Sequence, residues 1–463
     1  MLKIAFMGAG SFVFGETVLT DILKFPALVK DTLIYLEDID EHYLDLMYQY
    51  MQKIKESNPD ELEGVTFEKT TNQRKAIEDA KYIINAIHVG GYEAYKMDMD
   101  IPLKYGVTQC VGDTLGPGGV FRFLRNTSEM KSMLEDIQEV GYKSEGGDKP
   151  LFLNYTNPMA MLTWYCNSIL SDSTVGLCHG VSDTAAILSL VMGLKPQDFS
   201  YLCAGINHMA WFLELWYKEA PDNPWKDAYP KLIKTLENNP QLEAMERVRI
   251  DMMRTTGYFM TESSGHLSEY LPYYRKREDL LEKYKGDLGK MSFIPDFTSL
   301  KHAYNYEYSK KNSESVDEII SKKLSRKKAR LKKGASHEYA AHIINAMETN
   351  EAYGFNGNVI NKEGALITNL PKGCCVEVPV FADSHGLHPQ GGIELPTVCQ
   401  ALNMSNIMVQ KAAIEGALNL DKESIYHAVL LDPNTASVCS PQEVREMVEE
   451  MFEAEKKWLP HFY

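Results

Sequence analysis

The amino-acid sequence predicts an α/β protein, in which an N-terminal Rossmann-like, doubly wound parallel sheet packs on a mixed α+β C-terminal domain. Three observations support this fold class. A short apolar run enters a glycine turn at Gly8 and Gly10, a second apolar run ends in acidic residues, and apolar runs then alternate with helical patterns up to about residue 200. Strands that alternate with helices are typical of a parallel sheet covered on both faces.

The N-terminal segment predicts one complete βαβ unit. In chain order, the expected elements are a strand over residues 3–7, a turn over 8–11, a helix over about 15–23 and a strand over 32–36. The second strand ends in the acidic cluster Glu37, Asp38 and Asp40, and a second helix follows it.

The rest of the chain predicts the remaining strands and a second domain. The expected strands lie over 82–87, 151–155 and 174–177, with a helix over about 161–170. Later segments are a β-rich piece over 375–381 and closing helices over 408–419 and 441–457. No Pro/Gly/Ser-rich linker interrupts the chain, so we expect a Rossmann-like domain over 1–200 to share a cleft with an α+β domain over 201–463.

Composition argues against two kinds of partner. The net charge of −16 and the pI near 5.3 oppose a nucleic acid, because its binding depends on basic surface. The basic segment 322–333 has eight Lys or Arg residues but no aromatic residue, so we interpret it as a solvated helix or loop. No apolar stretch approaches the roughly 20 residues that span a membrane, and no secretion signal is recognisable, so a cytoplasmic protein is expected.

The eight cysteines predict reduced thiols. They are irregularly spaced and include the adjacent pair Cys374 and Cys375, which does not suit a simple disulfide framework. Cys178 is therefore free to act as a metal ligand, although a buried core cysteine is the commoner role for any single one.

The glycine turn after the first strand suits a dinucleotide. Gly8 and Gly10 remove side chains where the backbone must approach a pyrophosphate, and the helix that follows Ser11 offers amide donors. Gly90 gives a second turn where the backbone could pass close to the cofactor. Because Val13 stands where the fingerprint has its third glycine, a glycine turn that binds no nucleotide is the alternative.

The acidic end of the second strand favours NAD over NADP. A carboxylate there accepts hydrogen bonds from the ribose hydroxyls and repels a 2′-phosphate. We assign this role to Asp38 rather than to Glu37. The expected cofactor site thus comprises Gly8, Gly10, Ser11, Asp38 and Gly90.

A thiol and an imidazole could share a metal, although their spacing of 30 residues would by itself be a poor zinc motif. Cys178 and His208 each follow a candidate strand, and the ends of neighbouring strands converge where ligands bind in a doubly wound fold. Two protein ligands with open positions suit a catalytic metal that substrate oxygens complete, whereas a structural zinc would need four. A hydrogen-bonded core histidine is the alternative for His208.

Two polar segments could face the same cleft. The glycine-rich stretch 112–119 contains Asp113, which could orient sugar hydroxyls, unless the stretch is a purely structural loop. The segment 261–270 carries several titratable groups, any of which could serve as a general base. A capping role for its serines is the ordinary alternative.

Taken together, these motifs resemble glycoside hydrolase family 4, the NAD- and metal-dependent glycosidases, and within it the bacterial α-galactosidases. The resemblance covers almost the whole chain. It rests on the stretches 8–11, 38–40, 90–93, 113–119, 154–160, 178–179, 204–210, 369–371 and 373–378.

The resemblance implies cleavage of α-galactosides by elimination rather than by the two-carboxylate scheme. NAD⁺ oxidises the sugar at C3, a base removes the C2 proton, the aglycone leaves, and water adds before the hydride returns. A divalent metal, usually Mn²⁺, stabilises the charge on the C2 and C3 oxygens.

The resemblance also implies roles for single residues. Cys178 and His208 correspond to the metal ligands, Asn157 contacts the substrate, and Asn154 belongs to the same motif. His179 falls at the position where relatives have a residue that acts on the leaving group. His266 falls near the position from which relatives present the C2 base. Asp113, which could orient the sugar hydroxyls, is added as a further catalytic candidate and completes the expected site.

One departure concerns the sugar. Related α-galactosidases usually read Cys-His-Ser-Val, whereas this chain has Gly180, so an α-galacturonide or α-glucuronide is the near alternative. A uronate would need a cation near C6, which Arg122, Arg125 or Arg275 could supply.

Two alternatives belong to other classes. A malate- or lactate-type dehydrogenase would share the cofactor domain and the Thr156-Asn157-Pro158 motif, but not the pair Cys178 and His208. An NAD-sensing binding protein would bind the cofactor without turnover. The expected assembly is a homodimer or homotetramer with a small oligosaccharide as substrate.

Overall fold

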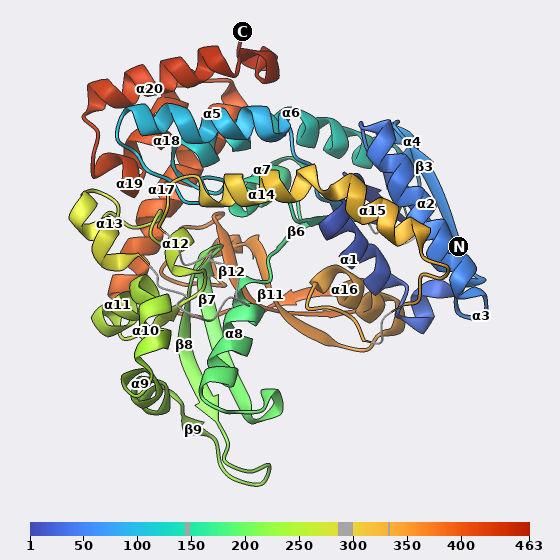
Figure 1. Ribbon diagram of the computed structural model, residues 1–463, viewed down its shortest axis with the longest axis horizontal. Helices are drawn as coiled ribbons and strands as arrows, with labels where there is room; N and C mark the ends of the chain where they lie inside the picture. Colours follow the sequence, from blue (N-terminus) through green and yellow to red (C-terminus); the bar gives the residue numbers. More distant parts are fainter. Residues whose placement is uncertain (144–148, 286–299, 332–333) are drawn as a thin grey trace.

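The computed structural model describes residues 1–143, 149–285, 300–331 and 334–463 (Figure 1). Within these ranges one sheet of 13 strands runs through the molecule, in the order β10-β8-β7-β12-β11-β6-β5-β4-β1-β2-β3, with β13 beside β12 and β9 beside β8. The division of the chain near residue 200 into two domains stays a prediction, because strands of both parts share this sheet.

Six parallel strands form the N-terminal half of the sheet and confirm the predicted Rossmann-like fold. They are β1 (Leu2–Met7), β2 (Thr32–Glu37), β3 (Val65–Thr70), β4 (Tyr82–Asn85), β5 (Leu151–Asn154) and β6 (Thr174–Leu177). Their helices are α1 (Phe12–Ile22), α2 (Glu41–Ser57), α3 (Pro59–Leu62), α4 (Gln73–Ile77), α5 (Gly91–Lys104), α6 (Gly116–Val140) and α7 (Met159–Ile169). Every residue of β2, β4, β5 and β6 is buried, as expected for strands covered on both faces.

The antiparallel half extends the same sheet. Its strands are β7 (Phe199–Ile206), β8 (Met209–Tyr217), β9 (Lys226–Asp227), β10 (Phe259–Met260), β11 (Tyr353–Ile360), β12 (Cys375–Asp383) and β13 (Gly386–Pro389). Strand β7 is the candidate strand expected before His208, whereas β8, its partner in the long hairpin, was not predicted. Its apolar runs are nearly continuous, and periodicity alone does not separate such a run from a buried helix.

Helices of the second half cover the sheet and close the molecule. They are α8 (Gly180–Val191), α9 (Tyr229–Glu237), α10 (Pro240–Met245), α11 (Arg247–Thr256), α12 (Ser264–Leu267), α13 (Glu278–Tyr284), α14 (Tyr304–Glu314), α15 (Val316–Ser325), α16 (Tyr339–Thr349), α17 (Thr397–Asn419), α18 (Lys422–Leu431), α19 (Pro433–Ala436) and α20 (Pro441–Ala454). In Figure 1 the β7–β9 segment and α8 form an arm at the bottom, and α14 and α15 cross the front. No helix of the described ranges is long and apolar enough to cross a membrane.

Two buried ion pairs of one arginine link the C-terminal helices to the N-terminal half. Arg125 on α6 donates to both carboxylate oxygens of Asp98 on α5, over 2.8 and 2.6 Å, and also pairs with Glu455 at the end of α20. All three side chains are fully buried or nearly so. These contacts use the guanidinium of Arg125 inside the protein, so the expectation that it could meet a uronate is wrong.

The basic segment 322–333 begins in α15, and residues 332–333 lie outside the described ranges. Most of its described residues are exposed, as expected for a solvated helix and loop. Lys323 pairs with Glu16 of α1, and the Nζ of Lys53 donates to the carbonyl of Leu324 over 2.6 Å. The segment therefore packs against α1 and α2 of the parallel half.

Candidate functional site

The predicted metal ligands lie together, and a third side chain joins them. The Sγ of Cys178 is 3.4 Å from Nε2 of His208, and Oε1 of Glu262 is 3.5 Å from the same nitrogen. One ligand atom of each residue falls within 4.8 Å of the others. Among the described residues, this is the one group of three or more His, Cys, Asp or Glu side chains whose ligand atoms are so close.

The sheet brings these three residues together from distant parts of the chain. Cys178 follows β6, His208 lies in the turn between β7 and β8, and Glu262 follows β10. A row of paired residues crosses the intervening strands and aligns the ends of β6 and β7: Gly176, Asn358, Glu377 and Gly205. His208 and Glu262 both have positive φ, +63° and +65°, a strain that clusters at functional sites.

The surroundings of His208 point its Nε2 at the cluster. Its Nδ1 is 3.2 Å from Oγ1 of Thr114 and 3.2 Å from the hydroxyl of Tyr270. Contacts of this kind fix the ring of a metal-binding histidine. Burial lowers the pKa of His208, which favours the neutral imidazole that binds metals.

Burial also determines the pKa of the Cys178 thiol. Desolvation raises its pKa well above the usual value, and the charge of Glu262 adds to this effect. The backbone N–H of Gly180 donates to Sγ over 3.4 Å. A bound cation would offset the cost of ionising this thiol.

His266 lies in a cage of carboxylates beside the cluster. Its Nδ1 is 3.4 Å from Oε2 of Glu262, and its Nε2 is 3.7 Å from Oδ1 of Asp113 and bonded to the hydroxyl of Tyr270. Burial alone would lower the pKa of His266, but the hydrogen bond to Glu262 and the nearby charges raise it to about 9. At neutral pH this imidazole therefore carries a proton.

Asp113 and Asn157 meet as the predicted substrate residues. The Nδ2 of Asn157 donates to Oδ2 of Asp113 over 3.1 Å, and Oγ1 of Thr114 donates to Oδ1 over 2.9 Å. Burial would raise the pKa of Asp113, but Arg122 and the two histidines lower it below its usual value. An ionised carboxylate and an amide thus face the cluster from the parallel half.

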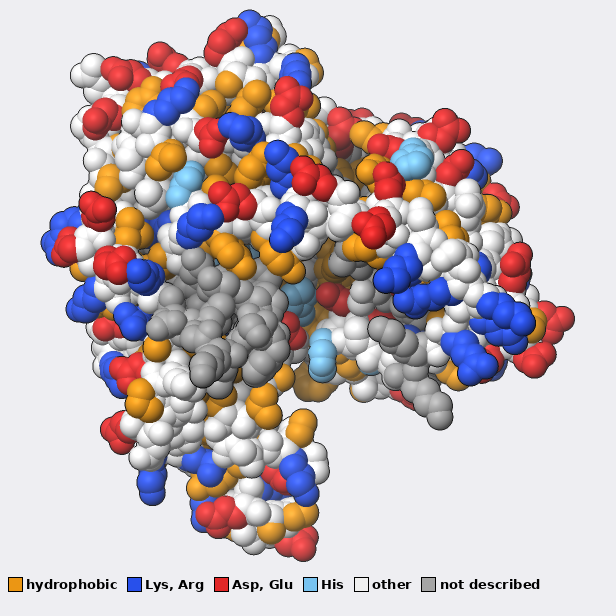
Figure 2. Space-filling view, viewed as in Figure 1, with side chains coloured by type: hydrophobic (Ala, Val, Ile, Leu, Met, Phe, Trp, Pro, Cys, Tyr) orange, Lys and Arg blue, Asp and Glu red, His pale blue; other side chains and the backbone are white. Residues whose placement is uncertain are grey.

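His179 lies on the outer side of the cluster, at the start of α8. Its side chain is 52% exposed, and its Nδ1 is 3.1 Å from Oε1 of Glu338. The hydrogen bond with Glu338 raises the pKa of His179 to about 9. In Figure 2, histidine and acidic side chains lie in a hollow near the middle of this face.

The glycine turn has the form that a dinucleotide requires. Gly8 has φ +82°, and a Cβ there would lie 2.7 Å from the carbonyl oxygen of Ala86. The N–H of Gly10 donates to Oδ2 of Asp38 over 2.7 Å, and a Cβ on Gly10 would meet that oxygen. Ser11 then precedes α1. The carboxylate of Asp38 is thus fixed beside the turn.

The other acids of this region have separate positions. Glu37 is buried, and desolvation raises its pKa to about 7. Asp40 caps α2 by accepting from the N–H groups of His42 and Tyr43. Gly90, with φ +84°, begins α5, and a Cβ on it would meet Ala94.

Two predicted residues have internal contacts instead of facing the cluster. Asn154 is fully buried, accepts from Nδ2 of Asn85 over 3.0 Å and donates to the carbonyl of Thr156 over 3.2 Å. Arg275 is buried and donates to the carbonyls of Thr108 and Leu300. These internal contacts leave neither side chain facing the substrate residues.

Arg122 remains as the cation near the substrate residues. Its Nε donates to the carbonyl of Asn157 over 3.2 Å, and its charge lowers the pKa of Asp113. Of the three arginines that could meet a uronate, Arg122 is the one that contacts an expected substrate residue.

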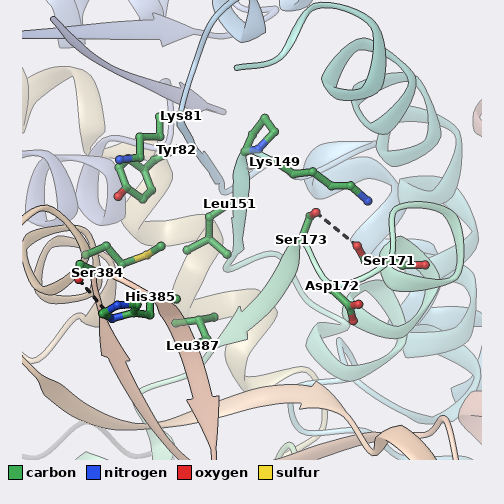
Figure 3. A pocket seen from close by; sticks show the side chains of 13 residues that line it. Lys81, Tyr82, Lys149, Leu151, Ser171, Asp172, Ser173, Ser384, His385 and Leu387 are labelled. Atoms are coloured by element: carbon green, nitrogen blue, oxygen red, sulfur yellow. Dashed lines mark hydrogen bonds between the residues drawn. The ribbon is translucent and has the colours of Figure 1, made fainter. Parts of the chain in front are cut away.

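A cavity of about 550 Å³ lies at the amino ends of the parallel strands, away from the cluster at their carboxyl ends (Figure 3). Lys81 and Tyr82 at the start of β4, Leu151 of β5 and Ser173 before β6 line it, together with His385 of the β12–β13 hairpin. The predicted site residues do not line this cavity. In a doubly wound sheet, ligands bind at the carboxyl ends of the strands, where the cluster lies.

Two residues that contact the predicted site were not singled out from the sequence. Glu262 and Tyr270 belong to the titratable segment 261–270, but their contacts with His208 follow from the folded chain. One signal was present: Glu262 and His266 are four residues apart, a spacing that can place two side chains together at a helix start.

Family comparisons cover nearly the whole chain. The model of the family 4 glycosyl hydrolases matches residues 3–194, and the model of the family 4 C-terminal domain matches residues 203–435. An α-galactosidase of Rhizobium meliloti is 38% identical over 99% of this chain and 89% of the relative. An α-galactosidase of Bacillus subtilis is 35% identical over the full length of both.

More distant relatives and solved structures complete the comparison. An α-galacturonidase of Lachnoclostridium phytofermentans is 25% identical over 99% of this chain and 97% of its own. The 6-phospho-β-glucosidase of Thermotoga maritima, solved with manganese, NAD⁺ and glucose-6-phosphate, has a TM-score of 0.76 at 20% identity and covers 99% of both chains. This structural likeness supports the fold described above.

Proposed function

Because the chain belongs to family 4 of the glycosyl hydrolases, we propose that this glycosidase cleaves α-galactosides of the melibiose type in a reaction that depends on NAD⁺ and a divalent metal. The observation that carries the proposal is the convergence of Cys178, His208 and Glu262 at the carboxyl ends of the strands, beside Asp113 and Asn157. The identity of 38% and 35% to two α-galactosidases supports the choice of sugar.

The glycine turn fits NAD⁺. Gly8 and Gly10 allow the turn to pack closely against Ala86 and Asp38, and this packing holds Asp38 where the ribose hydroxyls of the cofactor would lie. Ser11 and Gly90 complete the assigned turns. When bound, NAD⁺ supplies an acceptor for the hydride of the sugar C3.

The cluster fits a divalent cation. A thiolate, an imidazole and a carboxylate are a donor set that transition metals accept, and three protein ligands leave positions for substrate oxygens. A cation such as Mn²⁺ supplies Lewis-acid stabilisation of the charge on those oxygens. Cys178, His208 and Glu262 would hold it.

Asp113 and Asn157 orient the sugar. The ionised carboxylate accepts a hydrogen bond from a sugar hydroxyl, and the amide fixes that carboxylate and contacts the substrate. Asp113 is buried and Asn157 is half-buried, and hydrogen bonds shielded in this way are stronger than in water.

Proton transfer falls to the two histidines with raised pKa values. His179 carries a proton at neutral pH and is exposed, which suits a donor to the departing oxygen. His266 shares a hydrogen bond with Tyr270, and we assign the pair to the C2 proton. Since His266 is protonated at neutral pH, the pair accepts the C2 proton only after His266 has passed its own proton to a neighbouring carboxylate, Glu262 or Asp113.

The test is nitrophenol release from matched α-galactoside, α-galacturonide and α-glucuronide substrates, with and without NAD⁺, Mn²⁺ and a thiol reductant. We expect cleavage of the galactoside that is lost when either cofactor is stripped, and deuterium from the solvent at C2 of the product. Hydrolysis indifferent to both stripped cofactors would overturn the proposal.

A uronide is the second candidate, because Arg122 lies at the substrate residues and a related α-galacturonidase matches over the full length. An Arg guanidinium binds a carboxylate in a bidentate pair. Cleavage of a uronide alone would keep the chemistry and change the sugar.

A further inference from the structure

Gly180, the first residue of α8, lies so close to the metal cluster that a side chain would not fit there. A Cβ built on Gly180 would lie 2.6 Å from Oε1 of Glu262 and 3.5 Å from Sγ of Cys178. Real Cβ atoms do not approach another atom to 2.6 Å, so any side chain at position 180 would displace the Glu262 carboxylate. The backbone of Gly180 lies in an ordinary helical region, so alanine adds no strain of its own there.

The carboxylate of Glu262 divides its two oxygens between two neighbours. Oε2 lies 3.4 Å from Nδ1 of His266, whereas Oε1 faces Nε2 of His208 at 3.5 Å. An ion pair with His266 accounts for the first oxygen alone. The second points at the same ring nitrogen that faces the Cys178 thiol.

Resting on the proposed function, we infer that Glu262 is a third protein ligand of the metal, and that the missing side chain at Gly180 is what admits its Oε1 to the cluster. Position 180 therefore controls how many ligands the protein supplies. With three ligands the chain binds the cation before any sugar is present. With two, the cation would depend on substrate oxygens.

Gly180→Ala isolates this effect from charge. The variant keeps the carboxylate of Glu262 within the site but moves the oxygen away from His208. Glu262→Ala removes both the oxygen and the steric conflict. If both substitutions act through the same contact, Gly180→Ala will weaken binding of the cation in the wild type. It will not change the affinity for the cation in the Glu262→Ala background.

The experiment is calorimetric titration of the metal-free full-length protein with Mn²⁺ alone, under reducing conditions, without NAD⁺ or sugar. We expect Gly180→Ala and Glu262→Ala each to weaken Mn²⁺ binding by about tenfold or more, since the loss of even an outer partner of a metal ligand costs 10- to 100-fold. The double variant should bind as Glu262→Ala does. Far-ultraviolet circular dichroism checks that each variant is folded.

Cys178→Ser separates the two ways in which the result could fail. If it abolishes Mn²⁺ binding while Gly180→Ala and Glu262→Ala bind as the wild type, the inference is overturned, and the proposed function stands with Cys178 and His208 as the two protein ligands. If Cys178→Ser binds Mn²⁺ as the wild type does, the metal site of the proposed function is itself wrong. Additive losses in the double variant would also overturn the shared contact.

Discussion

The amide of Asn157 donates a hydrogen bond to the carboxylate of Asp113 over 3.1 Å, although 44 residues separate them. Asn157 follows β5, and Asp113 precedes α6, so the bond joins two loops at the carboxyl edge of the parallel sheet. Asp113 also accepts from Thr114 and faces His266. The pair thus connects the parallel half to the metal cluster.

Asp113→Asn should lower kcat/KM for the nitrophenyl α-galactoside by about 100-fold, within the range for removing one positioned polar group from an active site. The amide keeps the size of the side chain but loses the charge that accepts a sugar hydroxyl. Fluorescence titration should give an unchanged affinity for NADH, because Asp113 lies apart from the glycine turn. Near-normal turnover by this variant would remove Asp113 from the catalytic site.

Asp38→Ala should weaken NAD⁺ binding by about tenfold or more and narrow the preference for NAD⁺ over NADP⁺. The change removes the acceptor for the ribose hydroxyls and the charge that repels a 2′-phosphate. Titration with NADH and NADPH measures both effects.

Asp40→Asn is the matched control for Asp38. Asp40 lies two residues away but caps α2, and asparagine is an equally good cap. We expect its NADH affinity to equal that of the wild type. Equal losses in both variants would mean that the Asp38 assignment is wrong.

Chelation should abolish hydrolysis by the wild type, and added Mn²⁺ should restore it. The variant Cys178→Ser should not recover its hydrolytic activity at the same Mn²⁺ concentration, because a neutral hydroxyl binds the cation less tightly than a thiolate. Cys439→Ser is the control: its Sγ contacts the carbonyl of Tyr105, and it is not part of the cluster. Full recovery of Cys178→Ser would contradict the assigned site.

The parallel half of the fold could be predicted because its signals are local. The strand before Gly8, the acidic end of the second strand and the strand over 174–177 are each contained in a few neighbouring residues, and the structure confirms them. Strand β8, which follows His208, was missed because its mostly apolar run has no clear period. The family resemblance is likewise confirmed, since it rests on many short motifs along the chain.

The site was predicted in part for the same reason. Cys178 and His208 follow strands, and strand ends in this fold converge, so their 3.4 Å approach was foreseeable. The place of Glu262 was not, since it depends on the pairing of β10 with β8 and on a residue with positive φ. Arg125 looked free in the sequence because its partners Asp98 and Glu455 are distant along the chain.

The missing side chain at Gly180 illustrates the limit of residue-by-residue comparison. From the sequence, the exchange of serine for glycine concerned the sugar. In the structure the position lies against Glu262, so its first consequence is for the metal cluster.

The free energy of unfolding should decrease as the pH rises, because of the titration of Asp432. This residue is the N-cap of α19 and is fully buried. Burial raises its pKa to about 6, whereas the unfolded chain releases this proton near pH 3.9. Between these values the folded state binds more protons, so the stabilising contribution present at low pH is lost as pH rises through about 6.

Asp432→Asn removes this dependence, because the amide does not titrate and still accepts from Thr435. The free energy of unfolding of the variant relative to the wild type should therefore increase by about 1 kcal/mol from pH 5 to pH 7. Urea midpoints at several pH values measure the difference. Asp421→Asn is the control: Asp421 caps α18 in an exposed position with a lowered pKa, so it stays ionised in both states over this range and its difference should be flat. A flat difference for Asp432→Asn as well would show that the folded protein holds this carboxylate ionised throughout, with Thr435 compensating the cost of burial.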